Sequence, residues 1–171
     1  MSRKMPEIAI YTHPISLVQD PDRIRGAHRG DLIHQGLYFL ECVQEEEDVR
    51  QAMHRAFALA GVDADRWNMD EEFVAPLVRA LSLPEVRPWF EPGVVSLREA
   101  DMVDARGELH RIDRLIINDE RIEILDFKVG YREDEYIKQV LLYKDLVSNV
   151  FNKPVKAYIL YIDESTVIEV P

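Results

Sequence analysis

Three residues carry most of the reactive chemistry of this 171-residue sequence: Asp113, Asp126 and Lys128. They lie in two segments, about 108–117 and 121–129, that alternate apolar and polar residues and are therefore predicted to be β-strands. Residues two apart share one face of a strand, so Asp126 and Lys128 point the same way. Acids and a lysine grouped in this manner are suited to holding a divalent cation and an activated water molecule.

The turn between the two strands sets their register. If residues 118–121 form the hairpin loop, cross-strand partners have numbers that sum to 239, and Asp113 faces Asp126 on an otherwise apolar side of the sheet. Directly opposed carboxylates destabilise a strand pair, and an apolar surrounding adds to the cost. A bound Mg²⁺ or Mn²⁺ ion would remove this repulsion, because these hard cations bind carboxylates together with water and a phosphate oxygen.

Spacing alone also allows a purely structural explanation of the two aspartates. Arg111, Arg114 and Lys128 are close enough in sequence to pair with them as salt bridges at a sheet edge. In the catalytic explanation, Lys128 instead holds the attacking water beside the metal or helps to deprotonate it.

Gln139 and Tyr143 lie in a segment, about 134–150, whose apolar spacing predicts a helix. Because they are four residues apart, they share one helix face. A polar amide and a phenol on that face could reach the two aspartates or a phosphate group. The alternative is an ordinary amphipathic helix with a half-buried tyrosine.

His34 and Glu99 are weaker candidates when each is taken alone. His34 lies among apolar residues of a helix predicted for about 31–43, with Asp31 as its N-cap, where a histidine is either a ligand or a buried core residue. Glu99 falls on a strand predicted for about 94–103 and is by itself a strand-face acid.

The other elements follow from the same periodicities. We predict further helices over about 46–60, ended by Gly61, and 70–83, ended by Pro84; an extended or looped stretch over 84–92; a buried strand over 155–162; and an edge strand over 167–170. Helices, three antiparallel strands, a helix and a strand predict an α/β or α+β core.

Composition excludes several classes of protein. With 21 basic and 32 acidic residues, the net charge of −11 argues against a broad basic surface for nucleic acid. The single cysteine, Cys42, excludes an internal disulfide and a four-cysteine metal site. Neither a membrane-spanning apolar run nor a signal-peptide pattern is found, so we expect a cytoplasmic protein.

Taken together, five motifs in this order resemble the RecB-type nucleases of the PD-(D/E)xK class, which are often found at the C-terminus of superfamily 1 helicases. The motifs are Gly30-x-x-x-His34, Glu99 on a strand, Asp113-Arg114-Leu115, Asp126-Phe127-Lys128 followed by Gly130, and Tyr136-x-x-Gln139-x-x-x-Tyr143. Each motif is weak alone. The resemblance covers roughly residues 26–162.

The resemblance implies a restriction-endonuclease-like core, in which a mixed sheet with an antiparallel three-strand meander is flanked by helices and preceded by a helical part. The implied ligands of Mg²⁺ or Mn²⁺ are His34, Asp113, Asp126 and the main-chain carbonyl of Phe127. The implied catalytic residues are Asp113, Asp126, Lys128, Gln139, Tyr143 and, as an auxiliary acid, Glu99. One domain, 1–171, would contain a helical part (26–92) carrying His34 and a β-rich catalytic core (93–171).

This chain departs from the family pattern at two positions. His110 replaces a glycine that often precedes the first aspartate by three residues, and alternation turns it away from Asp113. Val129 replaces a threonine that often follows the lysine. The sequence also contains no Gly-x-x-x-x-Gly-Lys-Ser/Thr loop, so a helicase motor must lie on another chain or on a part not included here.

The function predicted from these residues is metal-dependent cleavage of DNA, on single strands or duplex ends, in repair or recombination alongside a helicase. One alternative is a catalytically weak or inactive nuclease-like module that binds DNA or docks on a helicase, which the charge of −11 favours. Another is an acidic protein-interaction domain, which would expose an apolar patch and lack a metal-sized acidic pocket.

Overall fold

The computed structural model describes residues 21–171 and is built on a five-stranded mixed sheet in the order β1-β2-β3-β4-β5. The strands are β1 (Ser96–Val103), β2 (Leu109–Ile117), β3 (Ile122–Lys128), β4 (Val155–Tyr161) and β5 (Thr166–Val170). β1, β2 and β3 form the predicted antiparallel meander, β3 and β4 run parallel, and β4 and β5 run antiparallel. The mixed α/β architecture is therefore confirmed.

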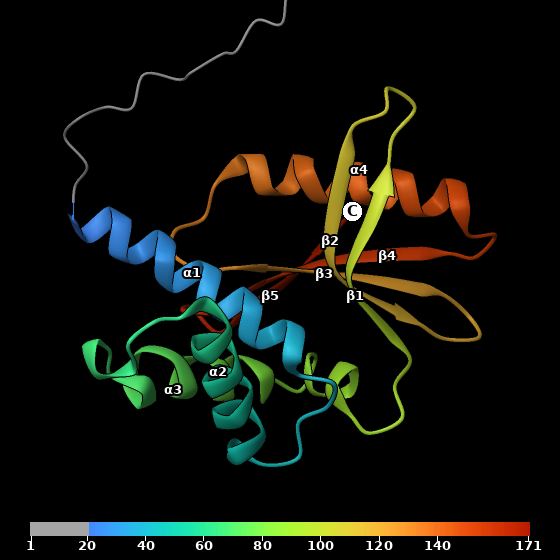
Figure 1. Ribbon diagram of the computed structural model, residues 1–171. Coiled ribbons are helices and arrows are strands. Elements are labelled where there is room, and N and C mark those ends of the chain that lie inside the picture. The colour runs from blue at the N-terminus through green and yellow to red at the C-terminus, as the bar shows by residue number, and fades with distance from the viewer. Residues whose placement is uncertain (1–20) are drawn as a thin grey trace, which may run out of the picture.

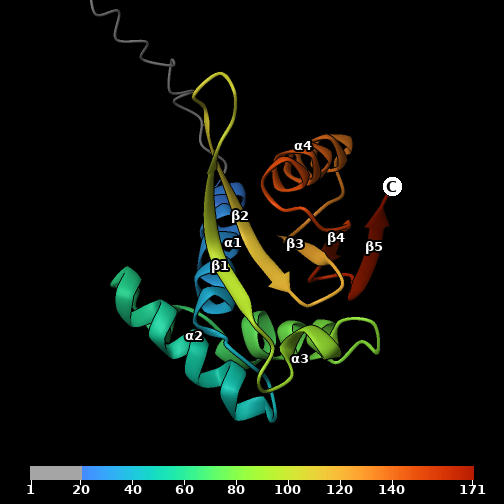
Figure 2. The same ribbon diagram turned by 90° about the vertical axis from the view of Figure 1, so that its right-hand side faces the viewer.

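Helices cover both faces of this sheet (Figures 1 and 2). One face carries α4 (Asp134–Val150), which crosses from β3 to the parallel strand β4. The other face carries the helical part: α1 (Pro21–Phe39), α2 (Glu46–Ala60) and α3 (Ala75–Leu81). Two separate apolar cores result, one under each helical layer. None of the helices within residues 21–171 is long and apolar enough to cross a membrane.

The prediction for α1 was wrong at its start, and the helix also ends earlier than predicted, at Phe39 rather than near residue 43. The helix already runs from Pro21, the first described residue, so Asp31 lies inside it rather than at its N-cap. Residues 25–28 of α1 are exposed, and their sequence has no apolar repeat that could indicate a helix. The buried half, which includes Ile33 and Leu37, carries the apolar repeat on which the prediction rested.

The helix predicted over 70–83 is divided in the structure. A π-helical turn, Asp70–Val74, precedes α3, and Pro76 explains it: proline has no N–H to donate to the carbonyl of Glu72. The side chain of Arg29 donates a hydrogen bond to that carbonyl instead, with Nε 2.8 Å from the oxygen. The stretch 84–92, predicted to be extended, also contains a short 3-10 helix, Arg87–Phe90.

The predicted hairpin register is confirmed where β2 and β3 pair, because Ile117 lies opposite Ile122 and the ladder continues in that register. It stops at Arg114 and Leu125, one step before the two aspartates. β2 then leaves β3 but stays paired with β1 as far as Leu109. The β1–β2 hairpin thus projects beyond the sheet beside α4 (Figure 2), and the sheet forks where Asp113 and Asp126 lie.

Candidate active site

The fork between β2 and β3 shapes the environment of Asp113. Pairing ends at Arg114, and the backbone N–H of Phe127 donates to Oδ2 of Asp113 at 2.7 Å. The carboxylate takes the place of a ladder acceptor and is fixed at the fork. Asp113 and Asp126 therefore follow the last pair of the ladder in the predicted register, but they are not themselves paired in it.

Asp126 is almost completely buried, with 3 % of its side chain exposed. Lys128 Nζ lies 2.8 Å from its Oδ2, yet this oxygen has no well-directed hydrogen-bond partner among the described residues. Burial and the nearby charge of Asp113 raise the pKa of Asp126 to about 6, against the opposing effect of Lys128. A buried carboxylate beside a second acid is suited to binding a cation.

His34 reaches the same fork from α1, on the opposite side of the sheet from α4. Its Nδ1 lies 3.5 Å from Oδ1 of Asp113, and about a third of the His34 side chain is exposed. Burial alone would lower the pKa of His34, but the hydrogen bond and charge of Asp113 raise it above its usual value. The structure thus brings His34, Asp113 and Asp126 together, although they come from three elements.

Lys128 is held by α4. Its Nζ lies 2.9 Å from Oε1 of Gln139 and 4.7 Å from the ring centroid of Tyr136, a cation–π contact. Tyr143, one turn beyond Gln139, is 4 % exposed, and burial followed by the charges of the two aspartates raises its pKa to about 12. The contact of Tyr136 is a feature that sequence reasoning missed; its signal was the three-residue spacing to Gln139.

Glu99 lies beside Asp113 in the β1–β2 ladder, between the pairs Arg98–Arg114 and Ala100–Ile112. Its backbone is left-handed, with φ of 53°, which is strained for a glutamate. Burial, and then the charge of Asp113, raise the pKa of Glu99. The charge of Asp113 therefore acts on this acid.

Two arginines fix α1, and with it His34, against the sheet. Arg114 is fully buried, packs over the ring of Phe90 at 4.3 Å and donates to the carbonyl of Leu40, just beyond α1. Unpaired carbonyls at a helix end attract such a cation. Burial lowers the pKa of Arg114 to about 10, so it stays charged at neutral pH. Earlier in α1, Arg29 pairs with Asp163 at 2.7 Å.

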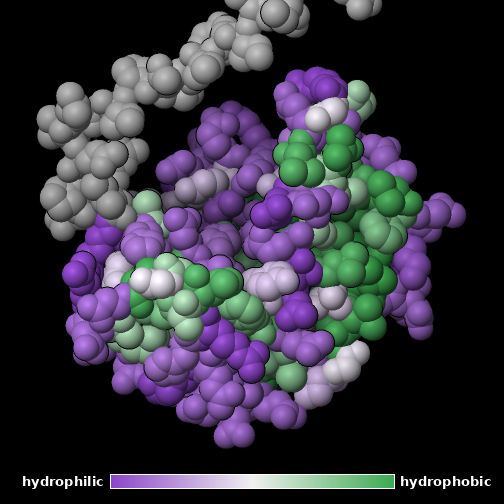
Figure 3. All heavy atoms as spheres, viewed as in Figure 1, coloured by the Kyte–Doolittle hydropathy of each residue, from purple (hydrophilic) through white to green (hydrophobic). Residues whose placement is uncertain are grey.

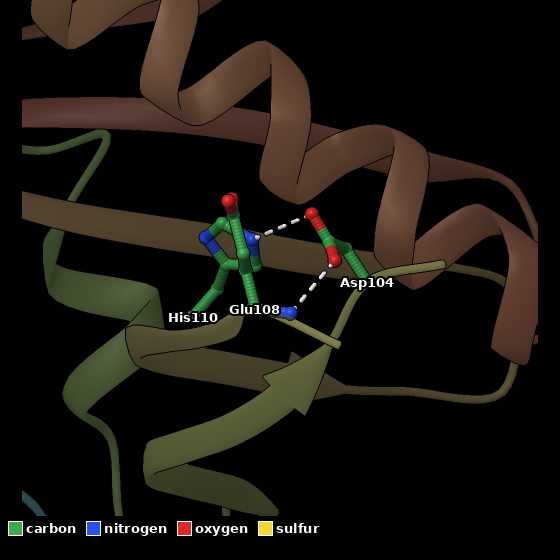
Figure 4. A group of neighbouring side chains, drawn as sticks. All are labelled: Asp104, Glu108 and His110. Carbon is green, nitrogen blue, oxygen red and sulfur yellow. Dashed lines mark hydrogen bonds and ion pairs between the residues drawn. The ribbon is translucent and has the colours of Figure 1, made fainter. Parts of the chain in front are cut away.

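A second group of possible metal ligands lies in the β1–β2 hairpin: Asp104, Glu108 and His110, whose ligand atoms lie within 4.8 Å of one another (Figure 4). Asp104 accepts from the backbone N–H groups of Arg106 and Glu108 and lies 3.3 Å from His110 Nε2. Arg106 pairs with both acids. This group therefore closes the turn, and His110 packs near Tyr143, 6.4 Å between ring centroids, without joining the fork.

Residues 11–170 match the family described as the PD-(D/E)XK nuclease superfamily, so the match includes every residue of the fork. The chain belongs to the PD-(D/E)XK nuclease superfamily. Its mixed five-stranded sheet with flanking helices is the restriction-endonuclease-like fold. Nucleases of this superfamily use divalent metal ions, and the hairpin group Asp104, Glu108 and His110 is a carboxylate–histidine group that could hold one. A search of curated proteins found no match.

Proposed function

We propose that this chain is a DNA nuclease that hydrolyses phosphodiester bonds with Mg²⁺ or Mn²⁺ at the fork of β2 and β3. The observation that carries the proposal is the burial of Asp126 beside a second carboxylate, Asp113, with Lys128 as its ion-pair partner. Two neighbouring carboxylates and a lysine in a buried position are costly unless a ligand compensates them.

The residues present fit a divalent cation. Asp113, Asp126 and the main-chain carbonyl of Phe127 offer the oxygen donors that Mg²⁺ and Mn²⁺ prefer, and His34 adds one nitrogen. A bound ion would lower the pKa of a coordinated water and offset the charge that builds on the phosphate. The hydrogen bond from Phe127 N–H orients Asp113 for this role.

The chain's own residues then have separate tasks. Lys128, held by Gln139 and by the ring of Tyr136, orients the attacking water. The water oxygen bonds to phosphorus and gives up a proton, one P–O bond of the backbone breaks, and the leaving oxygen takes up a proton. Tyr143 lies buried one turn beyond Gln139, and its raised pKa keeps its hydroxyl protonated. Glu99 acts as the auxiliary acid.

The net charge of −11 leaves little basic surface for gripping DNA, so a larger partner would have to supply that grip. We therefore propose an exonuclease-like activity on single-stranded DNA or duplex ends, in the cytoplasm. A helicase on the same protein or on a partner chain would deliver the strand during repair or recombination, as in RecB-type enzymes. Residues 1–171 would form one nuclease domain.

The same charge favours a second candidate, a nuclease-like module that has lost activity and docks on a helicase. Titration calorimetry with Mn²⁺ separates the two. A functional fork binds the ion in wild type and loses it in Asp126→Ala, whereas a degenerate fork gives no heat of binding in either protein.

The nuclease proposal is tested with linear duplex and single-stranded DNA in Mn²⁺. Asp126→Ala and Lys128→Ala are expected to lose cleavage, while Asp119→Ala and Lys156→Ala, matched surface changes outside the fork, keep it. Equal cleavage by wild type and both fork variants would show that the fork is not the catalytic centre.

A further inference from the structure

A cavity of about 560 Å³ opens beside the fork, between α1 and the β1–β2 hairpin. Its lining includes His34, Tyr38, Arg98, Glu99 and Arg111. Its volume is within the range of small-molecule sites. Because His34 and Glu99 belong to both the cavity and the fork, a ligand there would touch the proposed catalytic centre. A larger cavity, about 820 Å³, lies away from the fork, near Trp89 and Tyr158.

Tyr38 gives this cavity an aromatic wall. The residue is 44 % exposed, and the ring of Phe39 supports it at 5.5 Å between centroids. The guanidinium carbon of Arg98 lies 5.7 Å from the Tyr38 ring centroid, and its Nη1 donates to the Tyr38 carbonyl at 3.0 Å. Tyr38 is therefore fixed in place while much of its surface stays accessible, as stacking on a flat ligand requires.

The lining of the same cavity contains two arginines, Arg98 and Arg111, together with two acids, Asp31 and Glu99. Arg111 is two residues from Asp113, about 7 Å along an extended strand. Its guanidinium is positioned by Asp101, with Nε 2.8 Å from Oδ1, and lies 3.7 Å from Glu99. A guanidinium has five N–H donors, and these contacts with Asp101 use Nε and Nη2. Arg98 and Arg111 can thus hold a phosphate next to the one at the fork.

From these features we infer that the cavity binds one unpaired nucleotide of the substrate strand, with its base on Tyr38 and its phosphate on Arg98 and Arg111. The inference rests on the proposed function and names its substrate as single-stranded nucleic acid. A base can stack on Tyr38 only after leaving its partner, so a paired end pays for unpairing before it can occupy the cavity.

The test measures the affinity of a fluorescein-labelled single-stranded oligothymidylate, and of a duplex of equal length, by fluorescence anisotropy in Ca²⁺, with a gel to verify that the DNA stays intact. Tyr38→Ala is expected to weaken single-strand binding about 5- to 150-fold, the effect of losing one stacked base. Tyr38→Phe keeps the ring and the affinity. Arg111→Ala weakens binding, whereas Arg66→Ala, an exposed arginine elsewhere, does not.

Unchanged single-strand affinity in Tyr38→Ala, or an equal loss on duplex and single strand, would overturn the nucleotide cavity. Cleavage of DNA by the wild type in Mn²⁺ would still support the nuclease proposal in that case. The reverse result, Tyr38-dependent binding without cleavage in Mn²⁺, would support the cavity and reject the nuclease. Thermal melting of each variant separates loss of binding from loss of folding.

Discussion

Replacing Asp126 by asparagine should stabilise the metal-free protein while abolishing metal binding. Asparagine has nearly the shape of the protonated acid, and the ionised acid is disfavoured in the fold because its pKa rises from 3.8 to about 6. Two pKa units correspond to about 3 kcal/mol, at about 1.4 kcal/mol each. This is the expected gain in the free energy of unfolding of Asp126→Asn at pH 7.5 in EDTA.

The direction of the pKa shift of Asp126 also determines how the free energy of unfolding depends on pH. A carboxyl group whose pKa is raised on folding binds protons more tightly in the folded state, so wild-type stability falls as pH rises from about 4 to 6 and then levels off. Asp126→Asn lacks this loss. The titration of His34, whose pKa is also raised, remains in both proteins and largely cancels in the comparison.

Thermal melting in EDTA at pH 4.5 and 7.5 measures the effect. For a domain of this size, about 3 kcal/mol corresponds to about 6–12 °C in melting temperature at pH 7.5, with a smaller difference at pH 4.5. Mn²⁺ at about a hundred times its dissociation constant should raise the free energy of unfolding of the wild type by about 3 kcal/mol and leave that of the variant unchanged. A variant that is less stable than wild type in EDTA at pH 7.5 would refute the reasoning.

Three further predictions concern the supports of the site. In α1, Gly26→Ala should raise the free energy of unfolding by about 1 kcal/mol because its Cβ meets open space. Gly36→Ala should lower it by about 1–2 kcal/mol, since its Cβ would overlap the buried side chain of Met53. Urea unfolding measures both, and equal effects would contradict the packing. Gln139→Ala should lower cleavage about 10- to 100-fold with Mn²⁺ affinity unchanged, because it loosens the lysine; an unchanged rate would argue against that role. Glu99→Gly should be about 1 kcal/mol more stable than Glu99→Ala, because only glycine relieves the left-handed backbone; the same unfolding assay decides.

The sequence predicted the sheet well because its signals are local. Alternation along β2 and β3 and the four-residue turn between them gave the register that pairs Ile117 with Ile122. The point at which the ladder ends was not predictable, since it depends on how β2 diverges from β3 in three dimensions. For that reason the hydrogen bond from Phe127 to Asp113 could not be foreseen either.

Features set by tertiary contacts were also missed. Nothing in the residue type of Glu99 signals a left-handed backbone, which occurs where Glu99 is left out of the β1–β2 pairing. Residues 25–28 of α1 are exposed and have no apolar repeat, so the start of the helix could not be located. The cavity beside Tyr38 joins α1 to the β1–β2 hairpin, some 60 residues apart in sequence, and motif spacing does not extend that far.

A net charge of −11 is compatible with a nucleic-acid substrate if few phosphates are held, and held locally. Charges more than about 10 Å apart are screened at ordinary salt, so the acids of outer faces, such as Glu46 and Glu47, matter little at the fork. Two phosphates, one on Arg98 and Arg111 together and one at the fork, release few counterions and predict a slope of log affinity against log salt of about −1.4 on single strands. Anisotropy titrations across a salt series measure this slope; a value several times steeper would require a basic surface that the described residues do not provide.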